Sequence, residues 1–468
     1  MNVKLLVSQN CHDDFFFSMG SSGFLISRWG IVRIMNLLDS IQKNGIVGAG
    51  GAGFPSHIKF NASAEIVIMN AAECEPLLHK DKQMLKEYPQ ECIEGLKLVM
   101  KQVGASRGIL GIKAKYQYVF DALEPFMEEG MEFCRLGNFY PAGDEITLVY
   151  EATGRVVAPG QIPLSTGCVV TNVETLFNVY RNKPVTTSFL SVVGDVKTPL
   201  SLEVKVGATI ADCVKAAGGA QCEDPVFLLG GTMMGQLCED FELPVTKTTG
   251  GIVVLDRSHD LIRRYSRTKL HYDKIAKASC DQCNFCTELC PRYLMGHPIE
   301  PHKNMRNAGF AATNWDFVAG AEFCCECNLC SFYACPEDLD PKNISTDLKW
   351  IIKGKSEGRL KFAPDSVEEH PMANYRKAPI PKLMRKLGID NFLNEAPLKP
   401  GIVGGTQVRI ALSQHIGAPA HPVVKVGDKV QEGQLLAEPE AGAMGACIHA
   451  SLAGTVQAID DYIQIVEN

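Results

Sequence analysis

The sequence lacks any apolar run near the roughly 18 residues that a membrane-spanning helix needs. It also lacks an excess of positive charge: the formal net charge is -7 at pH 7, so nothing favours nucleic acid or an anionic membrane as a partner. The mildly apolar stretch 15–27 lacks the basic residues that open a secretory signal, because Asp13 and Asp14 precede it. We therefore expect no membrane insertion and no binding to nucleic acid.

A disulfide framework is also missing. The chain has 18 cysteines among 468 residues, and the ten outside two dense runs show no regular spacing. We interpret these ten as reduced, mostly buried thiols, which predicts a cytoplasmic or equally reducing location. The chain is too long for a single hydrophobic core, so several domains are expected.

The other eight cysteines are the strongest signal in the sequence. They form the runs Cys280-x2-Cys283-x2-Cys286-x3-Cys290-Pro291 and Cys324-x2-Cys327-x2-Cys330-x4-Cys335-Pro336. This arrangement is typical of [4Fe–4S] sites, and in two-cluster ferredoxins the fourth cysteine ligates the other cluster. Zinc and disulfides are the alternatives, but zinc sites use CxxC pairs rather than CxxCxxC triplets. We expect two [4Fe–4S] clusters. Cys325, beside Cys324, is interpreted as a non-ligand, and the x4 spacing departs by one residue from the commoner pattern.

A glycine-rich segment, Gly48-Ala49-Gly50-Gly51-Ala52-Gly53-Phe54-Pro55, follows a short amphipathic helix expected to begin at Met35 and to stop at Asn44-Gly45. Such a backbone can approach a phosphate or a planar ring closely, and Lys59 is a natural phosphate partner. A Rossmann loop is less favoured, because a helix rather than a strand precedes the glycines. An apolar strand at 66–69 then leads into Asn70-Ala71-Ala72-Glu73-Cys74-Glu75-Pro76, at the strand end where α/β folds bind ligands.

Together with Tyr140-Pro141-Ala142-Gly143-Asp144-Glu145 and Thr171-Asn172-Val173-Glu174-Thr175-Leu176, these motifs resemble the FMN/NADH-binding fold of respiratory complex I. The same fold occurs in RnfC electron-transport subunits and in the cobalamin reductases of propanediol-utilisation microcompartments. The resemblance implies FMN and NADH as cofactors. It implies that the FMN phosphate is held by Gly48, Gly50 and Lys59. The isoalloxazine and ribityl parts would be bound by Asn70, Glu73, Tyr140, Asn172 and Thr175. NADH would be accepted by Gly51, Phe54 and Glu75. Complex I has arginine and aspartate where Ala49 and Ala72 stand.

The remaining segments predict further units. Residues 184–256 read as short strands around one helix and resemble an SLBB β-grasp domain, whose role as a ligand-binding module or a spacer stays open. Residues 262–350 read as helices around the cysteine runs, as in an α-helical ferredoxin. Residues 404–468 resemble the barrel-sandwich hybrid of biotinyl and lipoyl carriers. The carrier lysine would fall at Ala443, so no attachment is expected.

The expected architecture is therefore a multidomain chain: an α/β FMN/NADH-binding domain at 35–180, a β-grasp domain at 184–256, an α-helical ferredoxin-like domain with two clusters at 262–350, a proline-rich basic linker at 355–403 and an all-β barrel-sandwich hybrid at 404–468. Residues 1–34 are expected to be disordered, or an upstream extension before a true start at Met35.

The order of the domains narrows the function. The sandwich is C-terminal, as in the cobalamin reductases, whereas RnfC proteins place it first. The resemblance implies an NADH-dependent reductase of cob(III)alamin and cob(II)alamin that supplies a corrinoid adenosyltransferase inside a bacterial microcompartment, with shell proteins as further partners. The alternatives are an RnfC-like protein, passing electrons between NADH and ferredoxin, a membrane complex or a substrate reductase, and a scaffold that binds corrinoid without flavin.

Overall fold

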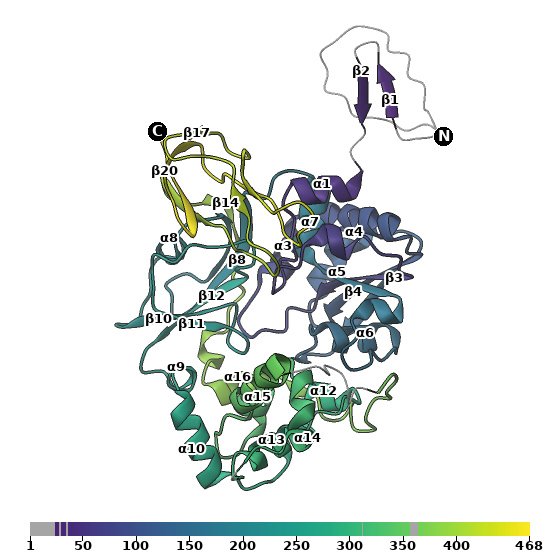
Figure 1. Cartoon of the computed structure of the whole chain (residues 1–468), viewed down its shortest axis with the longest axis vertical. Helices are drawn as coiled ribbons and strands as arrows, with labels where there is room; N and C mark the ends of the chain where they lie inside the picture. Colours follow the sequence, from purple (N-terminus) through teal and green to yellow (C-terminus); the bar gives the residue numbers. More distant parts are fainter. Residues whose placement is uncertain (1–23, 28–29, 34–35, 311, 356–363) are drawn as a thin grey trace.

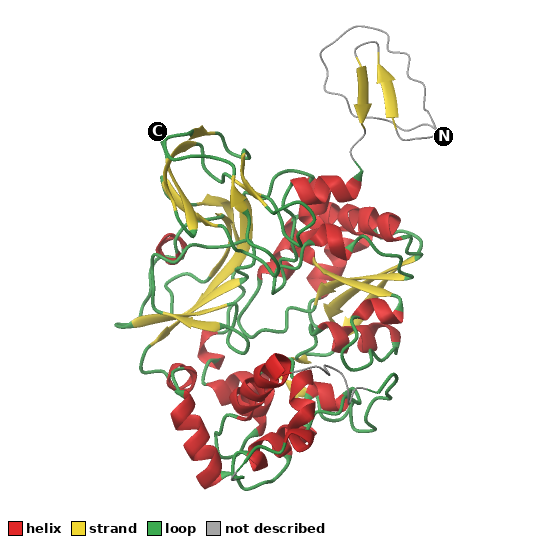
Figure 2. Cartoon of the chain, in the orientation of Figure 1, coloured by secondary structure: helices red, strands yellow, loops and turns green. Residues whose placement is uncertain are grey.

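The computed structural model describes residues 24–27, 30–33, 36–310, 312–355 and 364–468. An α/β unit and a β-rich region lie side by side, and a helical unit lies against both of them (Figures 1 and 2). The expectation for residues 1–34 falls mostly outside the described residues. Within that stretch, β1 (Phe24–Ser27) and β2 (Gly30–Arg33) pair as an antiparallel hairpin.

The α/β unit is built on a parallel sheet with the strand order β5-β4-β3-β7. Its strands and helices are β3 (Ile66–Ala71), β4 (Arg107–Lys113), β5 (Met131–Leu136), β7 (Cys168–Asn172), α1 (Leu37–Lys43), α2 (Ser56–Lys59), α3 (Lys80–Glu87), α4 (Pro89–Val103), α5 (Gln117–Leu123), α6 (Glu145–Thr153) and α7 (Val173–Arg181). The central strands are apolar on both faces, as a parallel sheet covered by helices requires. Neighbouring β3 and β7 place Asn70 and Asn172 in register at their carboxyl ends.

The β-rich region contains a six-stranded sheet in the order β11-β10-β12-β8-β9-β14. Its elements are β8 (Thr187–Gly194), β9 (Leu200–Lys205), β10 (Pro225–Leu229), β11 (Gln236–Cys238), β12 (Gly251–Asp256), β14 (Leu398–Val403) and α8 (Ile210–Ala216). Helix α8 begins with a capping box in which Thr209 and Asp212 bond each other's backbone N–H groups.

The segment predicted as a linker contains regular structure that packs on the other units. Strand β14 adds to the six-stranded sheet, and the short strand β13 (Ala378–Pro379) pairs with β6 (Phe139–Tyr140) of the α/β unit. Helix α16 (Ile380–Leu387) buries its apolar face, while Lys386 Nζ donates to the carbonyl oxygens of Tyr333 and Cys335. Composition alone suggested a linker because the segment is rich in proline and basic residues, but the apolar residues of α16 all lie on one side of the helix.

The helical unit holds the cysteine runs. Its helices are α9 (Asp260–Tyr265), α10 (Lys269–Ser279), α11 (Phe285–Glu288), α12 (Pro291–Leu294), α13 (Pro301–Asn307), α14 (Trp315–Val318) and α15 (Pro341–Lys355), with a 3-10 turn η3 (Ala319–Phe323) and a π-helical turn η4 (Cys330–Ala334). The apolar faces of α10, α13 and α15 meet in a small core around Met305 and Leu348.

The C-terminal residues form two small sheets, β15-β21-β20-β17 and β16-β18-β19. Their strands are β15 (Gln407–Ala411), β16 (His421–Pro422), β17 (Lys429–Val430), β18 (Leu435–Glu438), β19 (Ile448–His449), β20 (Gly454–Ile459) and β21 (Tyr462–Val466). One apolar core lies between the two sheets. Among the described residues, no helix combines the length and the apolar character needed to cross a bilayer.

Candidate functional site

The glycine-rich loop lies at the carboxyl edge of the parallel sheet, where α7 begins. Ala49 N donates to Thr175 Oγ1 (3.0 Å), and the Thr175 hydroxyl donates onward to the Val47 carbonyl. A Cβ at Gly50 would lie 3.1 Å from Asn172 Cβ, so the loop rests directly on Asn172. Gly51 is exposed, and nothing lies within 4 Å of the position its Cβ would take. The loop is thus held by α7 on one side and open on the other.

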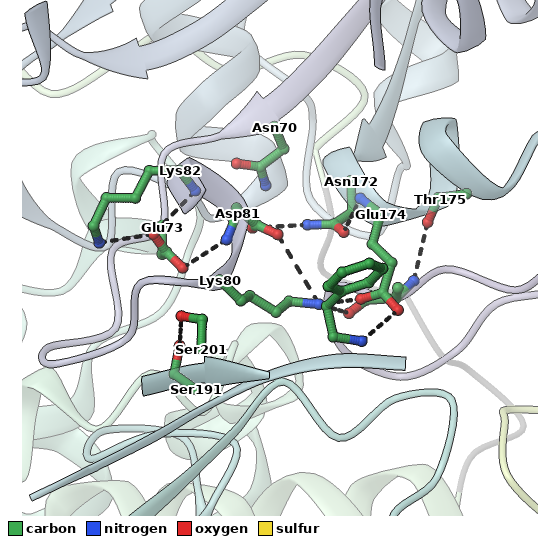
Figure 3. A network of polar contacts seen from close by, with 12 residues as sticks. Asn70, Glu73, Lys80, Asp81, Lys82, Asn172, Glu174, Thr175, Ser191 and Ser201 are labelled. Atoms are coloured by element: carbon green, nitrogen blue, oxygen red, sulfur yellow. Dashed lines mark hydrogen bonds and ion pairs between the residues drawn. The ribbon is translucent and has the colours of Figure 1, made fainter. Parts of the chain in front are cut away.

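A network of buried charges lies beneath this loop (Figure 3). Lys80 Nζ donates to Glu174 Oε2 (2.5 Å) and to the Ala49 carbonyl (3.2 Å), which joins the glycine loop to the start of α7. Asn172 Nδ2 donates to Asp81 Oδ2 (2.9 Å). The start of α3 therefore connects the glycine loop with the Asn172 motif.

Glu73 lies in the same network, with its backbone in the left-handed region (φ 36°). Its carboxylate accepts from Asp81 N (2.9 Å) and from Lys82 Nζ (2.8 Å). A positive φ at a buried non-glycine residue is a strained conformation of the kind found at functional sites. Burial alone would raise the pKa of Glu73, but Lys82 and His79 lower it, so this carboxylate stays charged.

In two neighbouring groups, burial favours the neutral form. Burial raises the pKa of Asp81 above its ordinary value and lowers the pKa of His79 to about 3. Asp81 Oδ1 and both ring nitrogens of His79 are buried without a hydrogen-bond partner in the protein. Buried polar atoms without partners are rare, and together with the open glycine loop they fit a polar cofactor such as a flavin.

Two other residues with an expected cofactor role have their polar groups bonded within this unit. Asn70 Nδ2 donates to the Gly143 carbonyl (2.8 Å). Lys59, expected at the phosphate, forms an ion pair with Glu145 (2.8 Å) that is partly exposed. The structure brings Gly48, Gly50, Asn70, Glu73, Asn172 and Thr175 to one edge of the sheet and leaves Gly51 and Phe54 on its exposed side.

Glu75 and Tyr140 instead connect to other units. Glu75 accepts from Met233 N and Met234 N (both 2.9 Å) in the loop after β10, and burial raises its pKa to about 7. Tyr140, fully buried, donates its hydroxyl hydrogen to the Cys327 carbonyl (2.8 Å). The Glu75 carboxylate, expected at NADH, is thus bonded to the β-grasp loop.

The two cysteine loops have matching backbones. Gln282 and Asn284 in the first loop have φ values of 57° and 67°; Glu326 and Asn328 in the second have 60° and 64°. The positions are 44 residues apart in both cases, as are the first cysteines. Asparagine tolerates this left-handed conformation better than most residues, which explains its place in both loops.

The extra residue of the second run is absorbed by η4. Cys335 N donates to the Cys330 carbonyl, five residues back, whereas in the first run Cys290 N donates to the Thr287 carbonyl. A π-turn holds one residue more than an α-turn. Cys290 (φ -69°, ψ 121°) and Cys335 (φ -69°, ψ 122°) consequently have nearly the same backbone conformation.

The cysteines group across the two runs. A cavity is lined by Cys280, Cys283 and Cys286 together with Cys335. The thiol of Cys330 has Cys324, Cys290 and Cys286 as neighbours, and the thiol of Cys327 has Cys325 first, followed by Cys330 and Cys290. This crossed grouping fits two ferredoxin-type clusters.

Among the described residues, no three His, Cys, Asp or Glu side chains converge tightly enough to hold a single metal ion. A [4Fe–4S] cube binds each thiolate at a different iron and needs wider spacing.

Several residues of the site carry no signature that the sequence analysis identified. They are His79, Lys80, Asp81, Lys82 and Arg292. Arg292 forms a buried ion pair with Asp144, with Nη2 to Oδ1 at 2.7 Å, and so fixes the first turn after Cys290 to the α/β unit. For the first four of these residues, the available signal was the charged run 79–83, which begins eight residues after the end of β3.

Comparison with known families agrees with this layout. Residues 41–181 match the Nuo51 FMN-binding domain, 189–237 the SLBB domain, 279–340 a 4Fe-4S dicluster domain and 394–468 the RnfC barrel sandwich hybrid domain. The expected FMN-binding, iron–sulfur and barrel-sandwich domains are thereby confirmed, and so is the multidomain architecture.

Whole-length relatives are also found. The chain is 41% identical over 431 residues to the cobalamin reductase PduS of Salmonella typhimurium, which covers 90% of this chain and 94% of that protein. It is 39% identical to the cobalamin reductase PduS of Citrobacter freundii, with the same coverage. Over 58% of this chain and 61% of the relative, it is 32% identical to a component of the Na(+)-translocating ferredoxin:NAD(+) oxidoreductase complex of Acetobacterium woodii.

Proposed function

The chain belongs to the family of the cobalamin reductases PduS, and on that premise we propose that it takes electrons from NADH and delivers them singly to cob(III)alamin and cob(II)alamin. It is an NADH-linked oxidoreductase of the flavo-iron–sulfur type. The observation that carries the proposal is the bond from Tyr140, in a flavin motif, to the carbonyl of Cys327 in a cluster loop.

The balance of the reaction requires a two-electron to one-electron step. NADH yields NAD+, a proton and two electrons, and each cob(II)alamin takes one electron to become cob(I)alamin. FMN, when bound, supplies this conversion. We assign the flavin chemistry to residues 35–180 and two [4Fe–4S] clusters to residues 262–350.

The chain's own residues hold the parts together. Lys80, Asp81 and Glu174 connect the glycine loop to the start of α7. We assign Cys280, Cys283, Cys286 and Cys335 to one cluster and Cys290, Cys324, Cys327 and Cys330 to the other. The Arg292–Asp144 pair and the Tyr140 bond keep the second set against the α/β unit.

We extend the proposal to the cellular setting that the family name implies. The reduced corrinoid would pass to an adenosyltransferase, and the protein would act in the cytoplasm within a propanediol-utilisation microcompartment, with shell proteins around it.

The experiment is anaerobic purification, with analysis of iron, sulfide and FMN, followed by an assay of NADH-driven cob(II)alamin reduction. We expect about eight iron atoms, as two four-iron clusters require, and one FMN per chain. NADH oxidation with ferredoxin as acceptor, but none with corrinoid, would instead favour a role like that of the Acetobacterium woodii relative.

A further inference from the structure

The exposed side of the glycine loop is contacted by the C-terminal sandwich. Ile416 N donates to the Ala52 carbonyl (2.9 Å). Gly53 has φ 73°, and a Cβ there would lie 2.8 Å from Thr248 Cγ2 and 2.9 Å from His415 Cβ. Three units therefore contact the loop, while Gly51 stays exposed: α7, the β-grasp segment at Thr248, and the sandwich segment that contains His415 and Ile416.

The sandwich segment is held firmly in this place. Ala446 N donates to His415 Nε2 (3.1 Å), which leaves His415 Nδ1 to donate to the Ile416 carbonyl (3.1 Å). Lys247, buried between the units, donates through Nζ to the Gly45 and Cys447 carbonyls (both 2.8 Å). The position of Ile416 over the glycine loop is therefore built into the fold.

The loop and the sandwich segment bonded to it have three exposed apolar side chains. Phe54 is 37% exposed, Ile416 49% and Met444 37%. Ala418 N donates to the Met444 carbonyl (2.8 Å), which ties the hairpin tip 442–445 to the segment with Ile416. This tip is the place where biotinyl and lipoyl carriers would have their lysine, and here it has Ala443 and Met444 instead. Exposed apolar groups beside an open glycine loop suit the flat ring of a nucleotide.

We propose that Ile416 and Met444 of the C-terminal sandwich form a wall of the dinucleotide site, facing the space above Gly51, and contribute to the binding of NADH. The inference rests on the proposed function, because it takes NADH as the occupant. It gives the sandwich a part in substrate binding, and it makes Ile416 a binding residue that lies more than 350 positions from the glycine loop in the sequence.

The test compares Ile416→Ala with Val423→Ala in the full-length holoprotein. Val423 is 51% exposed on the same sandwich and is a matched control of similar size. Binding of NAD+ to the oxidised protein is measured by calorimetry, and the KM for NADH is measured with ferricyanide as acceptor. Ile416→Ala should raise the Kd and the KM about five- to tenfold, as expected for the loss of one apolar contact, with FMN content and kcat unchanged. Met444→Ala should act in the same direction, and Val423→Ala should match the wild type.

Two results would overturn the inference: an unchanged Kd in both Ile416→Ala and Met444→Ala, or a loss of FMN in Ile416→Ala, which would place its effect on the flavin pocket. Failure of the proposed function looks different, since a wild-type protein that binds no NAD+ and oxidises no NADH would remove the occupant itself.

Discussion

The two cysteine loops have nearly the same backbone and very different surroundings. Cys283 of the first loop is exposed, whereas Cys327 at the same place in the second is 8% exposed and its carbonyl accepts the Tyr140 hydroxyl. Asn328 Nδ2 donates to the Met233 carbonyl of the β-grasp unit, whereas Asn284 Oδ1 is buried without a partner. One loop is thus a junction between domains and the other faces outward, so equal motifs should respond unequally to the same substitution.

Loss of a thiolate should have the largest effect. We expect Cys283→Ala and Cys327→Ala each to lose about half of the iron, because each removes a ligand of one of the two clusters. Cys327→Ala should also lower the Tm by several °C, since its loop connects three units. Iron and sulfide analysis with thermal unfolding measures both effects.

Cys325→Ser is the control for this pair. Cys325 lies beside the Cys327 thiol and Arg292, and we expect the variant to keep both clusters. A Cys325→Ser protein that has lost a cluster would contradict the assignment of Cys324 as the ligand.

The second-largest effect is expected from breaking the buried ion pair between Arg292 and Asp144, next to the second loop. Arg292→Met leaves Asp144 buried without its partner and should cost about 3–5 kcal/mol of stability. The matched control is Arg257→Met, which breaks exposed pairs with Asp224 and Glu239 and should leave the stability nearly unchanged. Chemical denaturation measures both variants. Equal losses would mean that the Arg292 pair does not hold the second loop in place.

Much of this contrast could not be predicted from the sequence. The cysteine spacing predicted two loops of one kind, because the ligand pattern is local to each run. It did not predict which loop is buried against the other units. Tyr140 and Arg292 are each far in sequence from their partners, Cys327 and Asp144, and contact them only in the folded chain. The x4 spacing had no evident explanation until the π-turn showed where the additional residue lies.

The candidate flavin site also contains residues that the sequence predicted and residues that it did not. The glycine loop, Glu73 and Asn172 carried recognisable motifs, and the structure places them together. Lys80 and Asp81 read as surface residues in sequence, because charged side chains are usually exposed. They are buried because Glu174 and Asn172, more than 90 positions away, supply the countercharge and the hydrogen bond. The bonds of Glu75 to the β-grasp loop were not predicted for the same reason, because the motif identifies the residue but not its partners.

The contact between Glu75 and the β-grasp loop should make the stability of the protein depend on pH. Its pKa is raised from 4.5 to about 7, first by burial, while Lys113 and the backbone N–H groups of the β-grasp loop oppose the rise; Tyr140 and Tyr265 face it as well. The folded state then binds more protons than the unfolded chain between these values. The free energy of unfolding should therefore fall as the pH rises from about 4.5 to about 7, by at most about 1.4 kcal/mol per pH unit.

Glu75→Gln removes this titration and should flatten the dependence of Tm on pH over that range. Glu128→Gln, which changes an exposed carboxylate, is the control and should keep the wild-type slope. A Glu75→Gln protein with an unchanged slope would show that another buried group, such as Asp81, sets the pH response.

The smallest expected effect comes from replacing the asparagine that both loops have at the same position. This comparison separates the two loops clearly, because the residue and its backbone conformation are the same in both. Asn284 and Asn328 both have positive φ, where glycine is at least as well suited as asparagine. Asn284→Gly should therefore change stability by no more than about 0.5 kcal/mol, whereas Asn328→Gly also loses the hydrogen bond to Met233 and should cost about 1 kcal/mol. Stopped-flow reduction with NADH should show slower cluster bleaching in Asn328→Gly only. Equal behaviour of the two variants would mean that the contact with the β-grasp loop contributes nothing, and that the surroundings of the second loop act through Tyr140 and Arg292 alone.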